Sequence, residues 1–352
     1  MDIDDEAHPK IRNATSKWKC GVVYVSPLPA ATPYFAPDAR HRSERLRARG
    51  ARYNTGSMPQ YFPIAAITDE FSGDVEDALR SMSELGMTGA ELRMLWGKNV
   101  LDASDGEIRR AANLAKERGL EIVSIASPIL KCVLPDSPPV DTRFQQDVFA
   151  SRHTFADQPR LMDRAVEIAR IAGARIVRVF SYWRTVEPEK CFDRAVEALA
   201  GLAEKAARHD LIIGLENEHA CNVATAAETA RVLAALDHPH LQVVWDPANA
   251  YVSGETPYPD GYELLPAGRI AHVHAKDCFL DGGRSRSLPR WGPLGECGID
   301  WRGQIAALRR DGYRGYISLE THWAGPNGDK HQASMICGRN LRGLVSAEAR
   351  RA

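Results

Sequence analysis

The chain has 352 residues, of which 44% are hydrophobic, and its formal net charge is −1. This length suits one α/β barrel with an extension, and the near-neutral charge provides no field that would attract nucleic acid or a membrane surface. No run of 18 or more apolar residues occurs, so a membrane-spanning helix is not expected.

The cysteines and the N-terminus bear on the compartment. Seven cysteines are scattered without a C-x-x-C pair, which excludes a zinc knuckle and a thioredoxin-like motif. Dispersed thiols fit a reducing compartment, and the acidic opening "MDIDDEAHPKIRN" lacks the apolar region of a secretory signal. We therefore expect a cytoplasmic protein.

Residues 1–57 differ in composition from the rest of the chain. They combine several prolines with a basic run, "ARHRSERLRARGAR", and show no sustained hydrophobic period. We predict that they form a flexible or loosely packed irregular extension, with a subunit-contact arm as the alternative. Residues 58–352 are expected to form the folded domain, and we expect this domain to assemble as a homo-oligomer.

From residue 64 onward, short apolar runs alternate with amphipathic stretches of about ten to twenty residues. Apolar runs of this kind are typical of parallel strands that are buried on both faces. The predicted strands are 64–68, 89–94, 121–127, 175–181, 211–216, 241–246, 270–276 and 316–320.

Glycines at the ends of the amphipathic stretches fit helix C-caps; they are Gly86, Gly119, Gly173 and Gly312. Eight strands separated by helices predict an α/β fold of the (β/α)8 barrel (TIM barrel) type. The alternative, an open doubly wound sheet, lacks a G-x-G-x-x-G motif after its first strand.

The last four predicted strands all end in a side chain that is able to bind a metal. In chain order these are Glu216, Asp246, His274 and Glu320. Active sites of barrels lie at the carboxyl ends of the strands, where these four would meet.

Asp246 before Pro247 also suits a turn, and a lone histidine is often a core residue. However, buried carboxylates need a cationic partner. Three carboxylates and one imidazole suit a divalent ion, and we expect Mn²⁺, with Mg²⁺, Co²⁺ and Zn²⁺ as alternatives.

Residues 60–345 resemble the xylose isomerase-like barrel superfamily, and in particular its sugar phosphate isomerase/epimerase group, which includes inosose dehydratase and tagatose 3-epimerase. The resemblance rests on the elements "ITDEFS", "AELR", "LENEH", "WDPANA", "HVHAKD", "PLGECGIDW" and "GYISLE". It implies that Glu216, Asp246, His274 and Glu320 are the metal ligands. Many members carry a histidine where this chain has Asn249, and an amide cannot transfer a proton.

These features predict a metal-dependent isomerase or epimerase of a sugar, keto-sugar or polyol. The reaction would remove a proton next to a carbonyl and pass through a metal-stabilised enediolate, with Glu216 and Glu320 as general base and acid. A dehydratase or lyase on a keto-sugar is the first alternative, and a non-catalytic sugar-binding subunit is the second. The predicted substrate-binding residues are Glu70, Arg93, His219, Asn249 and Lys276. Lys131 and His153 are further candidates.

Overall fold

The computed structural model describes residues 62–144, 152–280 and 288–349, and its central element is a sheet of eight parallel strands. The strands are β1 (Ile64–Ala66), β2 (Gly89–Leu92), β5 (Glu121–Ile129), β6 (Ile176–Val179), β7 (Ile212–Glu216), β8 (Leu241–Trp245), β9 (Ile270–Ala275) and β12 (Ile317–Leu319). Each coincides with one of the eight predicted strands, and the bounds differ by at most two residues. The prediction of a separate segment over residues 1–57 lies outside the described residues.

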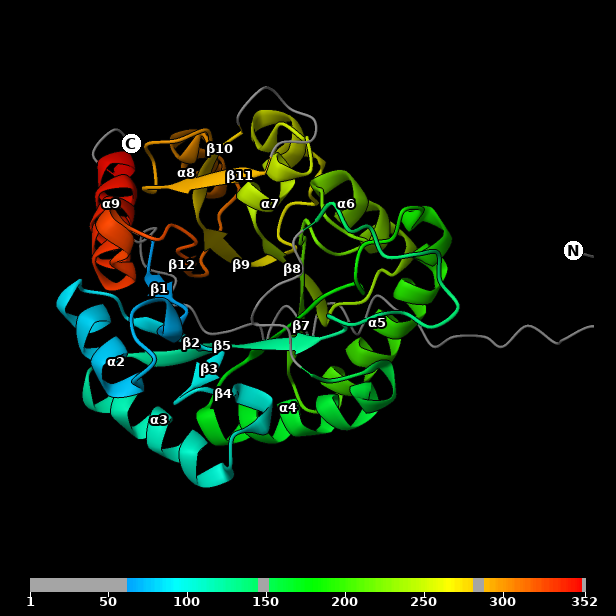
Figure 1. Cartoon of the computed structure of the whole chain (residues 1–352), viewed down its shortest axis with the longest axis horizontal. Helices are drawn as coiled ribbons and strands as arrows, with labels where there is room; N and C mark the ends of the chain where they lie inside the picture. Colours follow the sequence, from blue (N-terminus) through cyan, green and yellow to red (C-terminus); the bar gives the residue numbers. More distant parts are fainter. Residues whose placement is uncertain (1–61, 145–151, 281–287, 350–352) are drawn as a thin grey trace, which may run out of the picture. The chain divides into compact units, whose positions relative to one another are not determined.

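The order of the strands shows how the sheet curls into a barrel. Neighbours in the sheet run β1-β12-β9-β8-β7-β6-β5-β2, so the chain advances by one strand at each step around the ring. The two ends approach each other through a parallel bridge between Ile67 and Glu91. The result is a nearly closed barrel with helices around it (Figure 1), which confirms the predicted (β/α)8 fold.

Helices surround the strands and bury their apolar faces against the sheet. They are α2 (Val75–Glu84), α3 (Asp105–Glu117), α4 (Gln158–Ala172), α5 (Phe192–Ala207), α6 (Ala226–Ala235), α7 (Pro247–Val252), α8 (Trp301–Arg310) and α9 (Lys330–Ala349). Short helical turns lie between them: η1 (Thr68–Glu70), η2 (Val100–Asp102), η3 (Phe155–Asp157), η4 (Pro188–Cys191), η5 (Pro257–Gly261), η6 (Tyr262–Leu264) and η7 (Pro326–Gly328). No helix of the described part of the chain combines the length and the apolar character that crossing a bilayer requires.

Local sequence signals set the ends of these helices. Ser104 caps α3 in a capping box with Glu107, in which the side chain of each residue accepts a hydrogen bond from the backbone N–H of the other. The four predicted C-terminal glycines all have φ between 72° and 75°, a left-handed conformation that glycine adopts without a steric cost. The helix boundaries are thus largely local properties of the chain.

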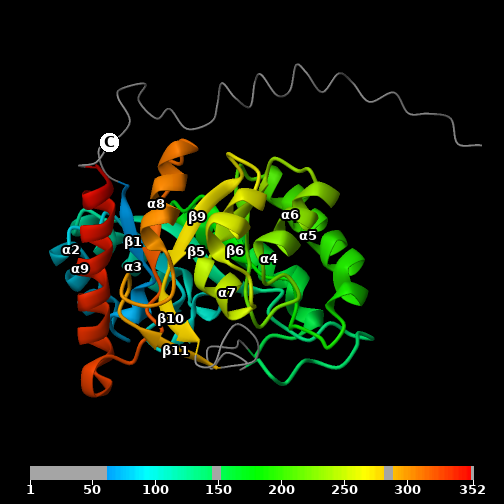
Figure 2. The same ribbon diagram turned by 90° about the horizontal axis from the view of Figure 1, so that it is seen from above.

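Two small antiparallel pairs extend beyond the carboxyl ends of the barrel strands. β3 (Met94–Leu95) pairs with β4 (Lys98–Asn99) after β2, and β10 (Asp277–Leu280) pairs with β11 (Pro289–Gly292) after β9. Most of the second pair belongs to the glycine- and proline-rich segment 278–301. Figure 2 shows β10 and β11 lying beyond the strands of the barrel. Residues 281–287, between these two strands in the chain, lie outside the described part.

One buried carboxylate contacts both ends of this segment. Asp277 accepts hydrogen bonds from the backbone N–H groups of Cys278, Gly295, Cys297 and Ile299, at 2.9 to 3.3 Å. Its side chain is buried, so these contacts replace the water that an ionised carboxylate needs. This arrangement explains why "HVHAKD" and "PLGECGID" occur together in the chain.

Candidate metal centre

The four side chains predicted as metal ligands converge at the carboxyl end of the barrel. Glu216 ends β7, Asp246 follows β8, His274 lies in β9 and Glu320 follows β12, which are four neighbouring strands of the sheet. One ligand atom from each lies within 4.8 Å of one ligand atom from every other. All four residues are between 0% and 4% exposed. The parallel order of the strands brings them together, because equivalent strand ends meet on one face of the barrel.

Asp246 serves two purposes with its two carboxylate oxygens. Oδ1 accepts a hydrogen bond from the backbone N–H of Asn249 at 2.8 Å and so caps the short helix α7. Oδ2 is buried and lies 2.9 Å from the Nζ atom of Lys276. Asn217 fixes the neighbouring strand ends to each other, since its side chain accepts from the Asp246 N–H and donates to the Asp246 carbonyl, both at 2.8 Å. The turn-forming and site-facing explanations of Asp246 therefore both hold.

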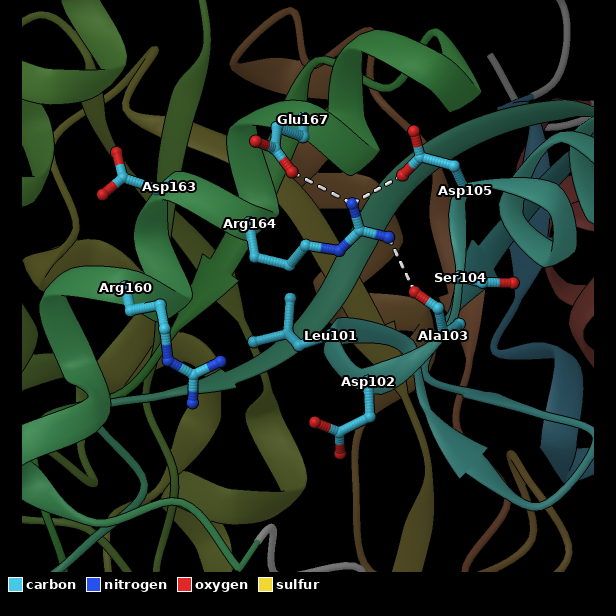
Figure 3. Close-up of a pocket in the computed structure, with 9 residues that line it drawn as sticks. All are labelled: Leu101, Asp102, Ala103, Ser104, Asp105, Arg160, Asp163, Arg164 and Glu167. Atoms are coloured by element: carbon cyan, nitrogen blue, oxygen red, sulfur yellow. Dashed lines mark hydrogen bonds and ion pairs between the residues drawn. The ribbon is translucent and has the colours of Figure 1, made fainter.

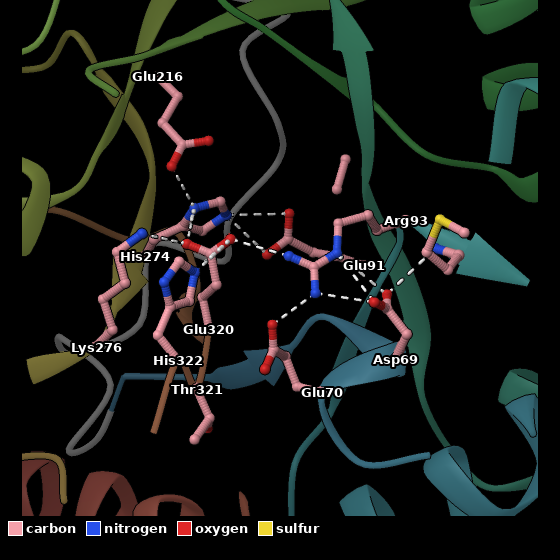
Figure 4. A network of polar contacts seen from close by, with 12 residues as sticks. Asp69, Glu70, Glu91, Arg93, Glu216, His274, Lys276, Glu320, Thr321 and His322 are labelled. Atoms are coloured by element: carbon pink, nitrogen blue, oxygen red, sulfur yellow. Dashed lines mark hydrogen bonds and ion pairs between the residues drawn. The ribbon is translucent and has the colours of Figure 1, made fainter. Parts of the chain in front are cut away.

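The imidazole of His274 directs its two nitrogens toward different carboxylates (Figure 4). Nδ1 lies 3.1 Å from Oε1 of Glu216 and 3.6 Å from Oε2 of Glu320. Nε2 lies 3.2 Å from Oε1 of Glu91, a residue of β2. Burial lowers the pKa of His274, but Glu216 and Glu91 outweigh this effect and hold it well above its ordinary value.

Two buried cations lie against the same carboxylates. Nζ of Lys276 is 2.7 Å from Oε2 of Glu320, and Nη1 of Arg178 is 3.2 Å from Oε2 of Glu216. Burial raises the pKa of Glu320, but the lowering by Lys276 and the nearby His322 is larger, so this pKa lies well below its ordinary value. Burial raises the pKa of Asp246 to about 6, with Lys276 opposing the shift. The pKa values of Asp246 and Glu320 are therefore shifted in opposite directions.

The donor set fits a divalent cation. Its three carboxylates contact three buried cations: Arg178 meets Glu216, Lys276 meets Asp246 and Glu320, and Arg93 meets Glu320. Arg93 also pairs with the carboxylates of Asp69 and Glu70, so its charge is shared. Oε2 of Glu216 and Oδ2 of Asp246 are buried and make ion pairs, but neither accepts a hydrogen bond within the described residues. Two ligands on opposite sides of an ion with bonds of about 2.1 Å lie about 4.2 Å apart. The bound of 4.8 Å on the distances between the four donors is close to this span.

Glu70 and Arg93, two predicted substrate-binding residues, contact each other. Nη2 of Arg93 lies 2.6 Å from Oε1 of Glu70 and 2.8 Å from Oδ2 of Asp69, and Nη1 lies 3.1 Å from Oε1 of Glu320. Oε2 of Glu70 also lies 2.7 Å from Nζ of Lys330. Arg93 therefore connects the acidic turn after β1 to the four candidate ligands Glu216, Asp246, His274 and Glu320, here called the ligand cluster, and it orients Glu320.

His219 and Asn249 form a second polar group beside Glu216. Nδ1 of His219 lies 2.9 Å from both Oδ1 of Asn249 and Oε1 of Glu218. The Asn249 amide donates to Oε1 of Glu216 at 3.3 Å. Lys131 lies 3.5 Å from Oε2 of Glu218, next to the rings of Phe180 and Trp183. Glu218 thus joins His219 to Lys131, and Asn249 joins His219 to Glu216.

His153 lies elsewhere in the described structure. Its Nε2 is 2.8 Å from Oδ1 of Asp102, which lines a cavity of about 600 Å³ between η2, the start of α3, and α4. In that cavity Arg164 contacts Asp105, Glu167 and the Ala103 carbonyl (Figure 3). Four acidic side chains and two arginines line this cavity, and none of its lining residues is a histidine, so it does not resemble the group of four candidate ligands.

Sequence reasoning missed three polar residues near the ligand cluster, Glu91, Arg178 and His322. Glu91 in "GAELRM" and Arg178 in "RIVRVFS" stand inside buried apolar runs, and this placement was the available signal. His322 lies 3.7 Å from Glu320 and packs against Trp291 of β11, a contact that no local pattern indicates.

Four aromatic residues that follow barrel strands in the chain, Trp96, Tyr182, Trp183 and Trp323, have mixed positions. Tyr182 and Trp183 are buried in hydrophobic clusters, while Trp96 and Trp323 are half-buried against the core. Trp96 and Tyr182 have φ of 48° and 64°, a conformation that bulky side chains seldom adopt. Both follow barrel strands, so the strain lies in the loops on the side of the ligand cluster.

The fold and the cluster define a class: a (β/α)8 barrel with a buried carboxylate and histidine centre at the carboxyl ends of its strands. The model of the xylose isomerase-like TIM barrel family matches residues 79–341. Because the match spans more than half of the chain, the protein belongs to the xylose isomerase-like TIM barrel family. No curated protein matches the sequence significantly.

Solved structures with the same fold have low sequence identity to this chain. The probable 3-DHS dehydratase AsbF, involved in petrobactin synthesis from Bacillus anthracis, is 20% identical, with a TM-score of 0.59 over 80% of this chain and 98% of that one. The 3-keto-D-glucoside 4-epimerase YcjR from E. coli is 18% identical, with a TM-score of 0.55 over 80% and 99%. The IOLI protein with a zinc atom is 14% identical, with a TM-score of 0.62 over 82% and 99%. These matches show the shared fold.

Proposed function

We propose that the protein is a divalent-metal-dependent isomerase or epimerase of a sugar, keto-sugar or polyol. The observation that carries the proposal is the convergence of Glu216, Asp246, His274 and Glu320, four buried donors from four neighbouring strands, within 4.8 Å. Three carboxylate donors and one imidazole at one buried point form the kind of ligand set that a divalent ion takes. The zinc atom of the IOLI structure and the epimerase and dehydratase among the similar folds support the proposal.

The four donors would hold the ion, and Mn²⁺ is the ion we expect for an oxygen-rich set with one imidazole. When bound, such an ion polarises a substrate carbonyl and stabilises the negative charge that develops on its oxygen. The residues of the chain hold the ligands in place: Asn217 joins the ends of β7 and β8, and Arg93 and Arg178 contact Glu320 and Glu216.

Proton transfer would fall to Glu216 and Glu320, whose strands β7 and β12 lie three steps apart around the barrel. One carboxylate takes the proton from the carbon next to the carbonyl, and the other supplies a proton to the product. Lys276 places an ammonium group 2.7 Å from Glu320, where it would balance negative charge on the substrate. Asn249 and His219 provide hydrogen-bonding groups for hydroxyls beside Glu216.

Elimination from a keto-sugar is the second candidate function. The ammonium of Lys276, buried among the carboxylates, would transfer a proton to the departing hydroxyl group, which leaves as water. The dehydratase AsbF has a similar fold. Removal of the proton next to the carbonyl is common to both candidates, so they differ only in the fate of the intermediate.

Proton NMR in D₂O distinguishes the candidates. The protein is loaded with Mn²⁺, incubated with ketoses, inososes and 3-keto-glycosides, and separated from the metal before spectra are recorded. Exchange of one carbon-bound proton with formation of an isomer or epimer supports the first candidate. An enone or a released aglycone supports elimination. Absence of metal binding after loading would contradict both and would favour a non-catalytic sugar-binding subunit.

A further inference from the structure

Glu91 is a fully buried carboxylate that no part of the proposed reaction uses. It lies in β2, and its side chain reaches across the interior of the barrel to two histidines of β9. Oε1 lies 2.8 Å from Nε2 of His272 and 3.2 Å from Nε2 of His274. Oε1 also accepts a hydrogen bond from the hydroxyl of Ser318 in β12. The strand pairing places Ser318 directly beside His274, so these groups occupy one layer of the barrel.

The two histidines differ in what their other ring nitrogen contacts. Nδ1 of His272 is buried and makes no hydrogen bond within the described residues. A buried N–H without a partner is costly, so the proton of His272 belongs on Nε2, where Glu91 accepts it. Nδ1 of His274 faces Glu216 and Glu320, on the side of the ligand cluster. Only one nitrogen of His274 is therefore available to an ion held by those carboxylates.

We propose that Glu91 is a positioning residue, which keeps a proton on Nε2 of His274 and thereby presents Nδ1 as the metal-binding nitrogen. The inference rests on the proposed function, since it assumes that His274 is a ligand. A carboxylate that accepts the second N–H of a metal-binding histidine fixes the ring and its tautomer. Ser318 and His272 in turn orient the Glu91 carboxylate by donating to it.

Glu91, His272 and His274 also place three potential ligand atoms within 4.8 Å of one another, so a second ion at this point is the competing explanation. The hydrogen bonds favour the positioning role, because Oε1 of Glu91 already accepts from Ser318 and contacts both rings. The number of ions bound distinguishes the two explanations.

The first test uses the wild-type protein, so it does not depend on whether a variant folds. The full chain is labelled with ¹⁵N-histidine and titrated with Zn²⁺, and the ring nitrogens are observed by NMR. We expect one equivalent of zinc bound, with the metal on Nδ1 of His274 and a proton retained on Nε2. Zinc on Nε2 would overturn the inference while leaving the proposed function intact. Failure to bind any zinc would contradict the proposed function itself.

The second test compares Glu91→Gln with Glu255→Gln, a control that makes the same chemical change away from the ligand cluster. The Glu255 carboxylate accepts hydrogen bonds from the backbone N–H groups of Ala226 and Ala227 at the start of α6. Loss of a carboxylate that hydrogen-bonds to a metal-binding histidine lowers the metal affinity by about 10- to 100-fold. We expect this loss, measured by competition with a chelating dye, for Glu91→Gln only. Equal affinity in wild type and Glu91→Gln would overturn the inference. Two zinc equivalents in wild type and one in Glu91→Gln would assign Glu91 to a second metal site instead.

Discussion

Replacing Glu216 by glutamine tests the candidate metal centre most directly. The substitution preserves the shape of the side chain and removes its charge. The carboxylate contacts Arg178 at 3.2 Å, His274 at 3.1 Å and the Asn249 amide at 3.3 Å. The glutamine oxygen can still accept from a donor, and Arg178 retains its bond to the Ala126 carbonyl and its contact with Glu320. Arg178 is therefore not left without a partner.

From these contacts we expect the free energy of unfolding of the metal-free protein to fall by about 1–3 kcal/mol, the range for hydrogen bonds that involve a charged group. This loss is smaller than the about 3–5 kcal/mol of a broken buried ion pair, because Arg178 keeps other partners and the repulsion among the carboxylates decreases. Turnover should fall by about 10²- to 10⁴-fold, the contribution of one acid–base group, and metal affinity should fall with it.

The assay combines urea denaturation, metal analysis after Mn²⁺ loading, and NMR turnover with whichever substrate of the panel reacts. Glu255→Gln serves as the matched control and should retain both metal and turnover. Turnover at the wild-type rate in Glu216→Gln would refute the assignment of this residue. A variant that does not fold would refute the argument that Arg178 remains paired.

Three further outcomes are expected. Mn²⁺ at about 1,000 times its dissociation constant should stabilise the wild type by about 4 kcal/mol, seen as a rise in melting temperature that a chelator reverses; no shift would argue against a metal centre. Asp277→Asn should destabilise the fold by about 1.5–3 kcal/mol, because its carboxylate accepts from four backbone N–H groups, and an unchanged urea midpoint would contradict this role. Gly214→Ala places a Cβ 2.6 Å from Cγ2 of Val244 and should cost about 1–3 kcal/mol by overpacking, measured by the same denaturation.

The barrel could be predicted because its elements are encoded locally. Strands buried on both faces need continuous apolar runs, and the helices between them need one apolar face and a capped end. Gly86, Gly119 and Gly173 mark helix ends by their backbone conformation alone. Such signals depend on neighbours in the chain, so they survive without knowledge of the tertiary structure.

The ligand cluster could be predicted for a related reason. In a parallel barrel, the residue at the end of each strand has a known position relative to the ends of the other strands. Glu216, Asp246, His274 and Glu320 could be grouped from their places in the chain once the strands were assigned, and the structure brings them within 4.8 Å. Their grouping follows from topology, without knowledge of any side-chain conformation.

The partners of these side chains could be decided only in three dimensions. Glu91 precedes His274 by 183 positions and Arg93 precedes Glu320 by 227, so no local pattern connects either pair. Which cation meets which carboxylate depends on the curvature of the closed barrel and on the rotamer of each long side chain. The sequence by itself determined which strand ends carry charge, whereas barrel closure decided how those charges are paired, since burial leaves each one only the partners that lie within a few ångströms.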